Sequence, residues 1–345
     1  MSFPSVQALA FAYGGAAAQG QLKSQTDDFI VEELLPFQPE GQGEHSFLYI
    51  EKCHENTEYV ARVLARHAGV RQRDIGFAGL KDRHGRTRQW FSIWLPGKSD
   101  PDWRALNSEQ LQILTVSRHP RKLKRGVLEA NRFQIRIRNW QGDVDKTQQQ
   151  LESIAKQGYP NYFGEQRFGR NGQNVNKALA MFAGAKVKRE QGSIYLSAAR
   201  SYLFNLILAE RVKAQTWNQA LAGDVFKLAH TNSYFHAELL EQTLLERISS
   251  GDIHPTAALF GQGNSGVTGE VAALEQLIIQ GQAALADGLL RAGLEQDRRA
   301  MRVIPEDLSW YFEQTLLKLS FKLPSGSYAT GLLREIVDTA ENAVS

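Results

Sequence analysis

Segments in which apolar and polar residues alternate dominate the first 140 residues of the chain. Residues 29–34 and 46–51 are rich in β-branched and aromatic side chains, with prolines and glycines between them, which predicts two strands joined as a hairpin or lying side by side. Residues 89–95 predict another strand. The clearest alternation covers residues 132–138, where Phe133, Ile135 and Ile137 alternate with Arg132, Gln134, Arg136 and Arg138. We expect one face of that strand to pack against the core.

The middle of the chain has the spacing of amphipathic helices. Asn56 is expected to cap a helix, because apolar residues recur at helical intervals after it. Further helices are predicted over residues 143–157, 198–215, with Ser197 as the cap, and 272–300.

The last part of the chain returns to a strand pattern. Apolar and polar residues alternate over 317–323, a turn is expected at 324–326, and a helix is expected over 328–337. Strands near both ends and helices between them predict an α+β domain interrupted by an insertion.

Composition limits the class of protein. The chain has 345 residues, 42% of them hydrophobic, enough for a large core and about two domains. A single cysteine, Cys53, excludes an intrachain disulfide framework and a cysteine cluster for zinc, which fits a reducing compartment. No stretch approaches the apolar length of a membrane span. The run 6–18 has no Lys or Arg before it, so we expect a mature N-terminus and a cytoplasmic protein.

Positive charge is concentrated in one region. Residues 61–140 hold 18 of the 40 Lys and Arg residues but 6 of the 37 Asp and Glu residues, a local net charge of +12 against −9 for the rest. Such a block is expected of a protein that binds phosphate groups, and we expect the polar face of the 132–138 strand to meet phosphate. Aromatic residues are interleaved with the cations, a composition that suits unstacked RNA bases better than a membrane surface.

One carboxylate, Asp82, lies in the densest part of this block. Lys81, Arg83, Arg86 and Arg88 would favour its ionised form and lower its pKa, so it could act as a nucleophile without an activating base. From this segment alone a solvated turn explains the charges equally well. Asp82 is nevertheless our first candidate for a catalytic residue, because of the basic and aromatic surroundings.

Other motifs give weaker signals. Residues 261–266 match the glycine spacing of a dinucleotide-binding loop, but no helix opens directly after them, so we expect an ordinary loop. The histidines lack metal-ligand spacing, and His84 fits a hydrogen-bonding group beside Asp82 better than a metal ligand. We expect chemistry without a metal, a nucleotide or another small-molecule cofactor.

Several long motifs resemble those of the TruD family of tRNA pseudouridine synthases. The segment 76–87 is similar to the family's catalytic motif, whose FAGxKD run carries a nucleophilic aspartate. Further similar segments occur in the family's order over almost the whole chain, at 27–33, 126–133, 161–169, 196–201 and 323–335.

The resemblance implies a fold and a reaction. The fold would be α+β, with a pseudouridine synthase catalytic domain built on a central mixed or antiparallel sheet at 1–157 and 303–345. A largely helical insertion domain would cover 158–302. The reaction would isomerise a uridine of tRNA, by resemblance uridine 13 of tRNA(Glu), to pseudouridine without a cofactor, in a monomeric protein.

The resemblance also implies roles for single residues. Asp82 would be the catalytic nucleophile and Lys23 a basic partner for it. Phe29, Asn131 and Tyr328 would line the uridine pocket, Phe133 would stack on the target base, and Lys81 would join them in binding the substrate. Tyr328 departs from members that have Phe, and its added hydroxyl needs a partner.

Two other classes of function fit part of the sequence. A non-catalytic RNA-binding protein would account for the basic block and the aromatics but would not need Asp82 among cations. A glycoside hydrolase would need a carboxylate pair whose proton donor sits in an apolar setting, the reverse of these surroundings. Both readings leave Asp82 as the residue to test.

Overall fold

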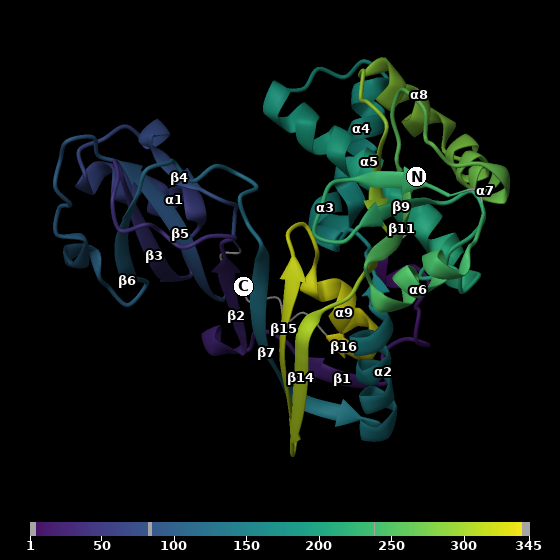
Figure 1. The fold of residues 1–345 in the computed structure, drawn as a ribbon, viewed down its shortest axis with the longest axis horizontal. Helices are drawn as coiled ribbons and strands as arrows, with labels where there is room; N and C mark the ends of the chain where they lie inside the picture. The colour runs from purple at the N-terminus through teal and green to yellow at the C-terminus, as the bar shows by residue number, and fades with distance from the viewer. Residues whose placement is uncertain (1–4, 82–84, 238, 340–345) are drawn as a thin grey trace. The chain divides into compact units, whose positions relative to one another are not determined.

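The computed structural model describes residues 5–81, 85–237 and 239–339. Its backbone forms two compact units, each made of segments distant in sequence (Figure 1). Unit 1 comprises residues up to 17, 143–304 and 327–338, and unit 2 comprises 18–142 and 305–326 together with the residues from 339 on. The units do not follow the expected domains of 1–157 with 303–345 and of 158–302. The division into a catalytic and an insertion domain stays a prediction.

Unit 2 is built on one mixed sheet, which confirms the expected α+β class with a central mixed sheet. The strand order is β14-β15-β7-β2-β5-β3-β6, with β1 added on β7 and β4 on β5. The strands are β1 (Ala18–Gln21), β2 (Phe29–Leu34), β3 (His45–Cys53), β4 (Ile75–Phe77), β5 (Arg86–Trp94), β6 (Leu111–His119), β7 (Ala130–Gly142), β14 (Glu306–Glu313) and β15 (Leu316–Pro324).

The expectation that the first two predicted strands pair with each other is wrong. β5 lies between β2 and β3, parallel to β2 and antiparallel to β3. A parallel neighbour needs a long crossover, and here β3, α1 (Thr57–His67) and β4 form it. The prolines and glycines after β2 predict a loop. They do not determine which strand pairs with β2.

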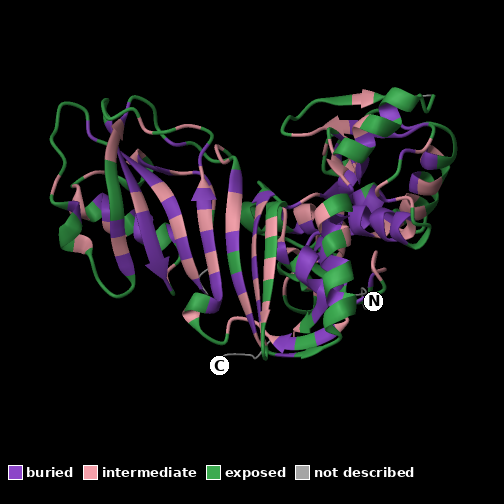
Figure 2. Cartoon of the chain, turned by 60° about the horizontal axis from the view of Figure 1, so that its bottom comes forward, coloured by how far each residue is buried: buried purple, intermediate pink, exposed green. Residues whose placement is uncertain are grey.

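The two faces of this sheet differ in character. On one face Phe29, Phe133 and Phe321 are buried, and the arginines of β7 alternate with them on the other face, as the sequence predicted. Figure 2 shows this alternation as bands of buried and exposed residues along the strands. α1, whose Asn56 cap is confirmed by a 2.7 Å bond from Tyr59 N to Asn56 Oδ1, packs on β3 and β5 with Val60 and Leu64.

Unit 1 consists mostly of helices around α5 (Arg189–Lys213), which is buried along most of its length. The other helices are α2 (Val144–Gln157), α3 (Glu165–Phe168), α4 (Gln173–Phe182), α6 (Gln242–Ser250), α7 (Gly269–Gln280), α8 (Ala283–Arg291) and α9 (Ala329–Ile336). Its short strands are β8 (Tyr159–Pro160), β9 (Val225–Leu228), β10 (Tyr234–His236), β11 (Ile253–Leu259), β12 (Asp297–Ala300) and β13 (Arg302–Val303), and β16 (Val337–Thr339) follows α9.

Two predicted helices differ from the observed ones. α5 begins at Arg189, so Ser197 lies inside it and caps nothing; its first turns pack on α4, a contact that local sequence does not contain. Residues 272–300 form α7, α8 and β12, because the chain leaves the helical conformation at Gln282 and Asp297–Ala300 pairs with β11. The predicted helices at 143–157 and 328–337 are confirmed within one residue at each end.

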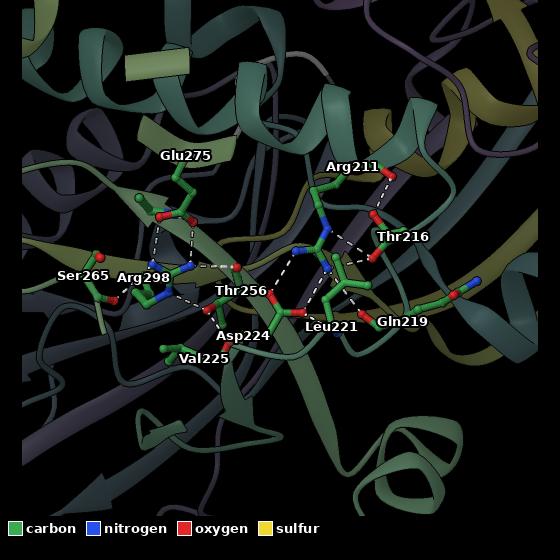
Figure 3. Close-up of polar contacts among 11 residues, drawn as sticks. Arg211, Thr216, Gln219, Leu221, Asp224, Val225, Thr256, Ser265, Glu275 and Arg298 are labelled. Carbon is green, nitrogen blue, oxygen red and sulfur yellow. Dashed lines mark hydrogen bonds and ion pairs between the residues drawn. The ribbon is translucent and has the colours of Figure 1, made fainter. Parts of the chain in front are cut away.

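Buried ion pairs join the helices and strands of unit 1 (Figure 3). Arg211 of α5 donates to both carboxylate oxygens of Asp224 at 2.9 and 3.0 Å. Arg298 of β12 donates to both carboxylate oxygens of Glu275 of α7 at 2.7 and 3.2 Å. None of the helices in the described part of the chain combines the length and apolar character that spanning a bilayer requires.

Candidate active site

The segment that leads to Asp82 is tied to the sheet of unit 2 by a chain of hydrogen bonds. The backbone N–H of Lys81 donates to Thr57 Oγ1 at 3.0 Å, and this hydroxyl donates to Gln89 Oε1 at 2.8 Å. The Gln89 amide in turn donates to the carbonyl of Gly79 at 3.3 Å. Asp82, the candidate nucleophile, and His84 lie outside the described residues.

A buried ion pair fixes the side chain of Lys81. Its Nζ lies 2.8 Å from Glu33 Oε2, and the two side chains are 7% and 0% exposed. The other Glu33 oxygen accepts from the backbone N–H of Trp90 at 3.1 Å. Burial raises the pKa of Glu33, and the Lys81 ammonium opposes this rise. Lys81, predicted to bind substrate, therefore has a partner inside the protein.

The chain beyond residue 84 returns to the same strand. Gly85 has φ +122°, and a Cβ added there would lie 2.7 Å from the carbonyl oxygen of Phe29. Only glycine allows this approach of two backbones. Lys81 and Gly85, on either side of the undescribed residues, are thus both held against β2.

Three phenylalanines lie side by side on the buried face of β2, β7 and β15. The Phe133 ring stacks on Phe321 at 5.4 Å between centroids and meets Phe29 edge-on at 6.2 Å. Phe133 is 7% exposed, so most of its ring is core. Lys23 Nζ lies 4.4 Å from the centroid of the Phe29 ring, within the range of a cation–π contact. The predicted residues Lys23, Phe29 and Phe133 are therefore neighbours.

Asn131 lies on the same face, directly opposite Glu33 in the register of β2 and β7. Its Oδ1 is buried, and no donor among the described residues bonds to it. A buried acceptor without a donor is unusual in a folded protein and is often found at functional sites. This geometry suits the predicted contact between Asn131 and a substrate donor.

The cations of the basic block fall into two groups. Many pair with carboxylates: Arg86 with Asp27 and Glu51, Arg88 with Glu51, Arg118 with Asp100, Arg132 with Glu32, and Arg138 with Asp28. These carboxylates offset part of the positive charge that the sequence led us to expect around Asp82. The arginines of β7 also lie on the face of the sheet opposite the phenylalanines.

The second group of cations lies in the loop between β6 and β7. Arg121 and Lys124 are exposed, and Arg125 lies over the Phe77 ring at 4.9 Å. Gly126 N–H donates to the carbonyl of Ala78 at 2.8 Å, which holds this loop against the strand leading to Asp82. These exposed cations, rather than those of β7, lie next to the strand that leads to Asp82.

Tyr328 is the one predicted pocket residue that belongs to unit 1. Its hydroxyl accepts from an Arg167 Nη2 at 2.9 Å, and its ring meets Phe163 edge-on at 6.2 Å. Arg299 also lies over the Phe163 ring, 4.2 Å from its centroid, and burial lowers the pKa of Arg299 to about 10. The hydroxyl that needed a partner has found one in Arg167.

Glu33 and Arg167 were not among the site residues that the sequence predicted. The alternation of Phe29, Val31 and Glu33 along β2 was a usable signal, since it puts a carboxylate on the buried face. No comparable signal existed for Arg167, whose contact with Tyr328 joins residues far apart in sequence. In the described part of the chain, no group of His, Cys, Asp and Glu side chains is arranged to hold a metal ion.

The chain is similar to known proteins over most of its length. A family model described as tRNA pseudouridine synthase D (TruD) matches residues 5–183 and 171–336. The tRNA pseudouridine synthase D of Methylococcus capsulatus is 45% identical over 338 residues, which cover 97% of this chain and 96% of the relative. That of Pseudomonas syringae pv. tomato is 46% identical over 331 residues, covering 95% and 94%.

The fold is also found in a solved structure. A putative tRNA pseudouridine synthase D from Methanosarcina mazei matches with a TM-score of 0.72 and 20% identity, over 96% of both chains. Fold and sequence together define a tRNA pseudouridine synthase, an isomerase of uridine in tRNA. More narrowly, the chain belongs to the tRNA pseudouridine synthase D family.

Proposed function

We propose that this chain converts uridine 13 of tRNA(Glu) to pseudouridine, with Asp82 as the nucleophile. The observation that carries the proposal is the fixing of Lys81 and Gly85 against β2, on the face that holds Phe29 and Asn131. Fixed residues on both sides of Asp82 support this role, because a catalytic carboxylate has to be held in a defined position.

The reaction exchanges one glycosidic bond for another. The bond from N1 of uracil to C1′ of the ribose breaks, the base turns within the pocket, and C5 bonds to C1′. C5 loses a proton and N1 gains one, so the exchange involves no net oxidation and needs no metal or nucleotide. Asp82 either attacks the ribose or the base covalently, or removes a ribose proton so that uracil departs.

The remaining predicted residues would hold the base. A uridine must leave its stack to reach Asp82, and aromatic side chains favour the unstacked state. Phe29, Phe133 and Tyr328 would supply such surfaces. Lys23, which lies beside the Phe29 ring, would be the basic partner of Asp82. Asn131 Oδ1, which accepts no hydrogen bond from the described residues, suits the N3–H donor of uracil. We expect the protein to act as a monomer in the cytoplasm, without a cofactor.

An Asp82→Asn protein tests the assignment. It should bind an unmodified tRNA(Glu) transcript within several-fold of the unaltered protein and form no pseudouridine, since the carboxylate acts on the bond and contributes little to backbone binding. Asp145→Asn makes the same chemical change at an exposed position of α2 and should retain full activity. Product formation by Asp82→Asn would remove Asp82 as the nucleophile.

The position of the modified uridine needs its own test. A transcript with cytidine at position 13 should yield no pseudouridine, and mapping of the unaltered transcript should find the product at position 13 alone. Product elsewhere would leave the isomerase activity intact but refute the position. Binding without product by the unaltered protein would point instead to an RNA-binding role.

A further inference from the structure

Tyr328 is held by contacts to its ring and to its backbone. Its ring rests against Phe163, and its backbone carbonyl accepts from Tyr159 Oη at 3.2 Å and from Gly331 N–H at 3.0 Å. A Cβ on Gly164 would lie 3.7 Å from the ring, so this glycine is close below it. The position of the phenol oxygen is therefore set before any substrate binds.

Arg167 determines which way the hydroxyl hydrogen points. The guanidinium is fixed by a 3.0 Å bond from Nη1 to Ser197 Oγ and donates from Nη2 to Tyr328 Oη at 2.9 Å. Arginine has only donors, so the phenol oxygen must be the acceptor in this bond. The hydroxyl hydrogen is left to donate elsewhere.

The hydroxyl has no acceptor within the described parts of the chain. Among the described residues, the hydroxyl bonds to Arg167, which is the donor, and the Tyr328 residue is only partly buried. A fixed donor at a half-open position is suited to an acceptor that arrives with a ligand. The carbonyl oxygens of uracil are such acceptors.

We propose that the Tyr328 hydroxyl, oriented by Arg167, donates a hydrogen bond to a carbonyl oxygen of the bound uracil. Tyr328 is then a binding residue and Arg167 a positioning residue. The inference rests on the proposed function, since it takes Tyr328 to line the uridine pocket. It goes beyond the resemblance, because members with Phe at this place have no hydroxyl to donate.

The test compares tRNA affinities of proteins with and without the hydroxyl. An Asp82→Asn background prevents turnover, and Tyr328→Phe is added to it. Three tRNAs serve as probes: one with uridine, one with 2-thiouridine and one with 4-thiouridine at the target position. Sulfur accepts hydrogen bonds more weakly than oxygen, so each thio-tRNA weakens one of the two carbonyl acceptors.

Tyr328→Phe should weaken binding of the uridine tRNA about threefold to tenfold, the range of one neutral hydrogen bond. The loss should largely vanish with one of the two thio-tRNAs, because the acceptor has already been weakened there. Tyr311→Phe, which removes a hydroxyl from a side chain that is 61% exposed, is the matched control and should show no such dependence on sulfur.

Two results would overturn the inference. Either Tyr328→Phe leaves the affinity for the uridine tRNA unchanged, or it lowers the affinity equally for all three tRNAs, which would mean that the hydroxyl only satisfies Arg167. The proposed function is judged separately, by pseudouridine formation with the unaltered protein. Its failure would appear as missing product, not as a missing sulfur effect.

Discussion

Glu33 faces Asn131 across β2 and β7, yet the two side chains do not satisfy each other. The Glu33 carboxylate is bonded to Lys81 and to the backbone of Trp90, and Asn131 Oδ1 is left without a donor among the described residues. Glu33 thus holds the segment that leads to Asp82, whereas Asn131 keeps a buried acceptor, which under the proposed function bonds to the substrate.

The Lys81–Glu33 pair should be important for stability. Lys81→Met should lower the free energy of unfolding by roughly 3–5 kcal/mol, because it leaves a buried carboxylate without its counter-charge. Adding Glu33→Gln should recover much of this loss. Urea unfolding of the two proteins at pH 8 measures the difference, and equal stabilities would contradict a buried pair.

The same two proteins should differ in their response to pH. Burial raises the pKa of Glu33 above 4.5, and Lys81→Met removes the ammonium that opposes this rise. A raised pKa favours the native state at low pH, and that advantage is lost as pH rises through the folded value. The deficit of Lys81→Met against the double variant should therefore shrink as pH falls towards 4.5 and grow as pH rises. A deficit independent of pH would show that Glu33 does not titrate in the native state.

Phe133 and Phe321 provide a matched pair for the stacking hypothesis. Both are buried and stacked on each other, so Phe133→Leu and Phe321→Leu should each lower stability by about 1 kcal/mol or more. Only Phe133→Leu should also slow turnover per folded molecule. The loss should correspond to about 1–3 kcal/mol, the contribution of base–aromatic stacking. Similar turnover in both variants would make Phe133 a core residue only.

Affinity for tRNA should fall steeply with salt, and the loop between β6 and β7 should account for part of the slope. Neutralising one phosphate contact changes the slope of log K against log salt by about 0.7–0.9, so Arg121→Gln with Lys124→Gln should reduce it by roughly 1–2. Arg118→Gln with Arg132→Gln removes two cations that already have carboxylate partners and should change it less. Equal changes would mean that the ion pairs open on binding.

Buried and exposed ion pairs near the end of α5 should differ in strength. Asp224→Asn should destabilise the protein by roughly 3–5 kcal/mol, because Arg211 and Asp224 are 2% and 0% exposed. Glu210→Gln breaks an exposed pair with Lys213 and should cost less than about 1 kcal/mol. Thermal unfolding distinguishes the two, and a similar shift in both would contradict the burial of Arg211.

Much of the local structure could be predicted because it is encoded locally. The alternation in β7 and the Asn56 cap of α1 involve residues a few positions apart. The insertion of β5 beside β2 and the early start of α5 depend on packing between distant segments, which periodicity does not contain. The same difference between local and long-range contacts applies to the candidate site. Phe29 and Phe133 came from motif resemblance, whereas the bond between Arg167 and Tyr328 exists only in the folded chain.

The pairing of β7 with β15 has a consequence for the order in which the protein can be completed. The two strands match over eight positions, and all of residues 143–304 lie between them in sequence. A ribosome must therefore release the whole of that intervening segment before the sheet can receive β15. No contiguous fragment of the chain can form the complete sheet of unit 2 by itself. Every fragment that contains both β7 and β15 also contains most of unit 1.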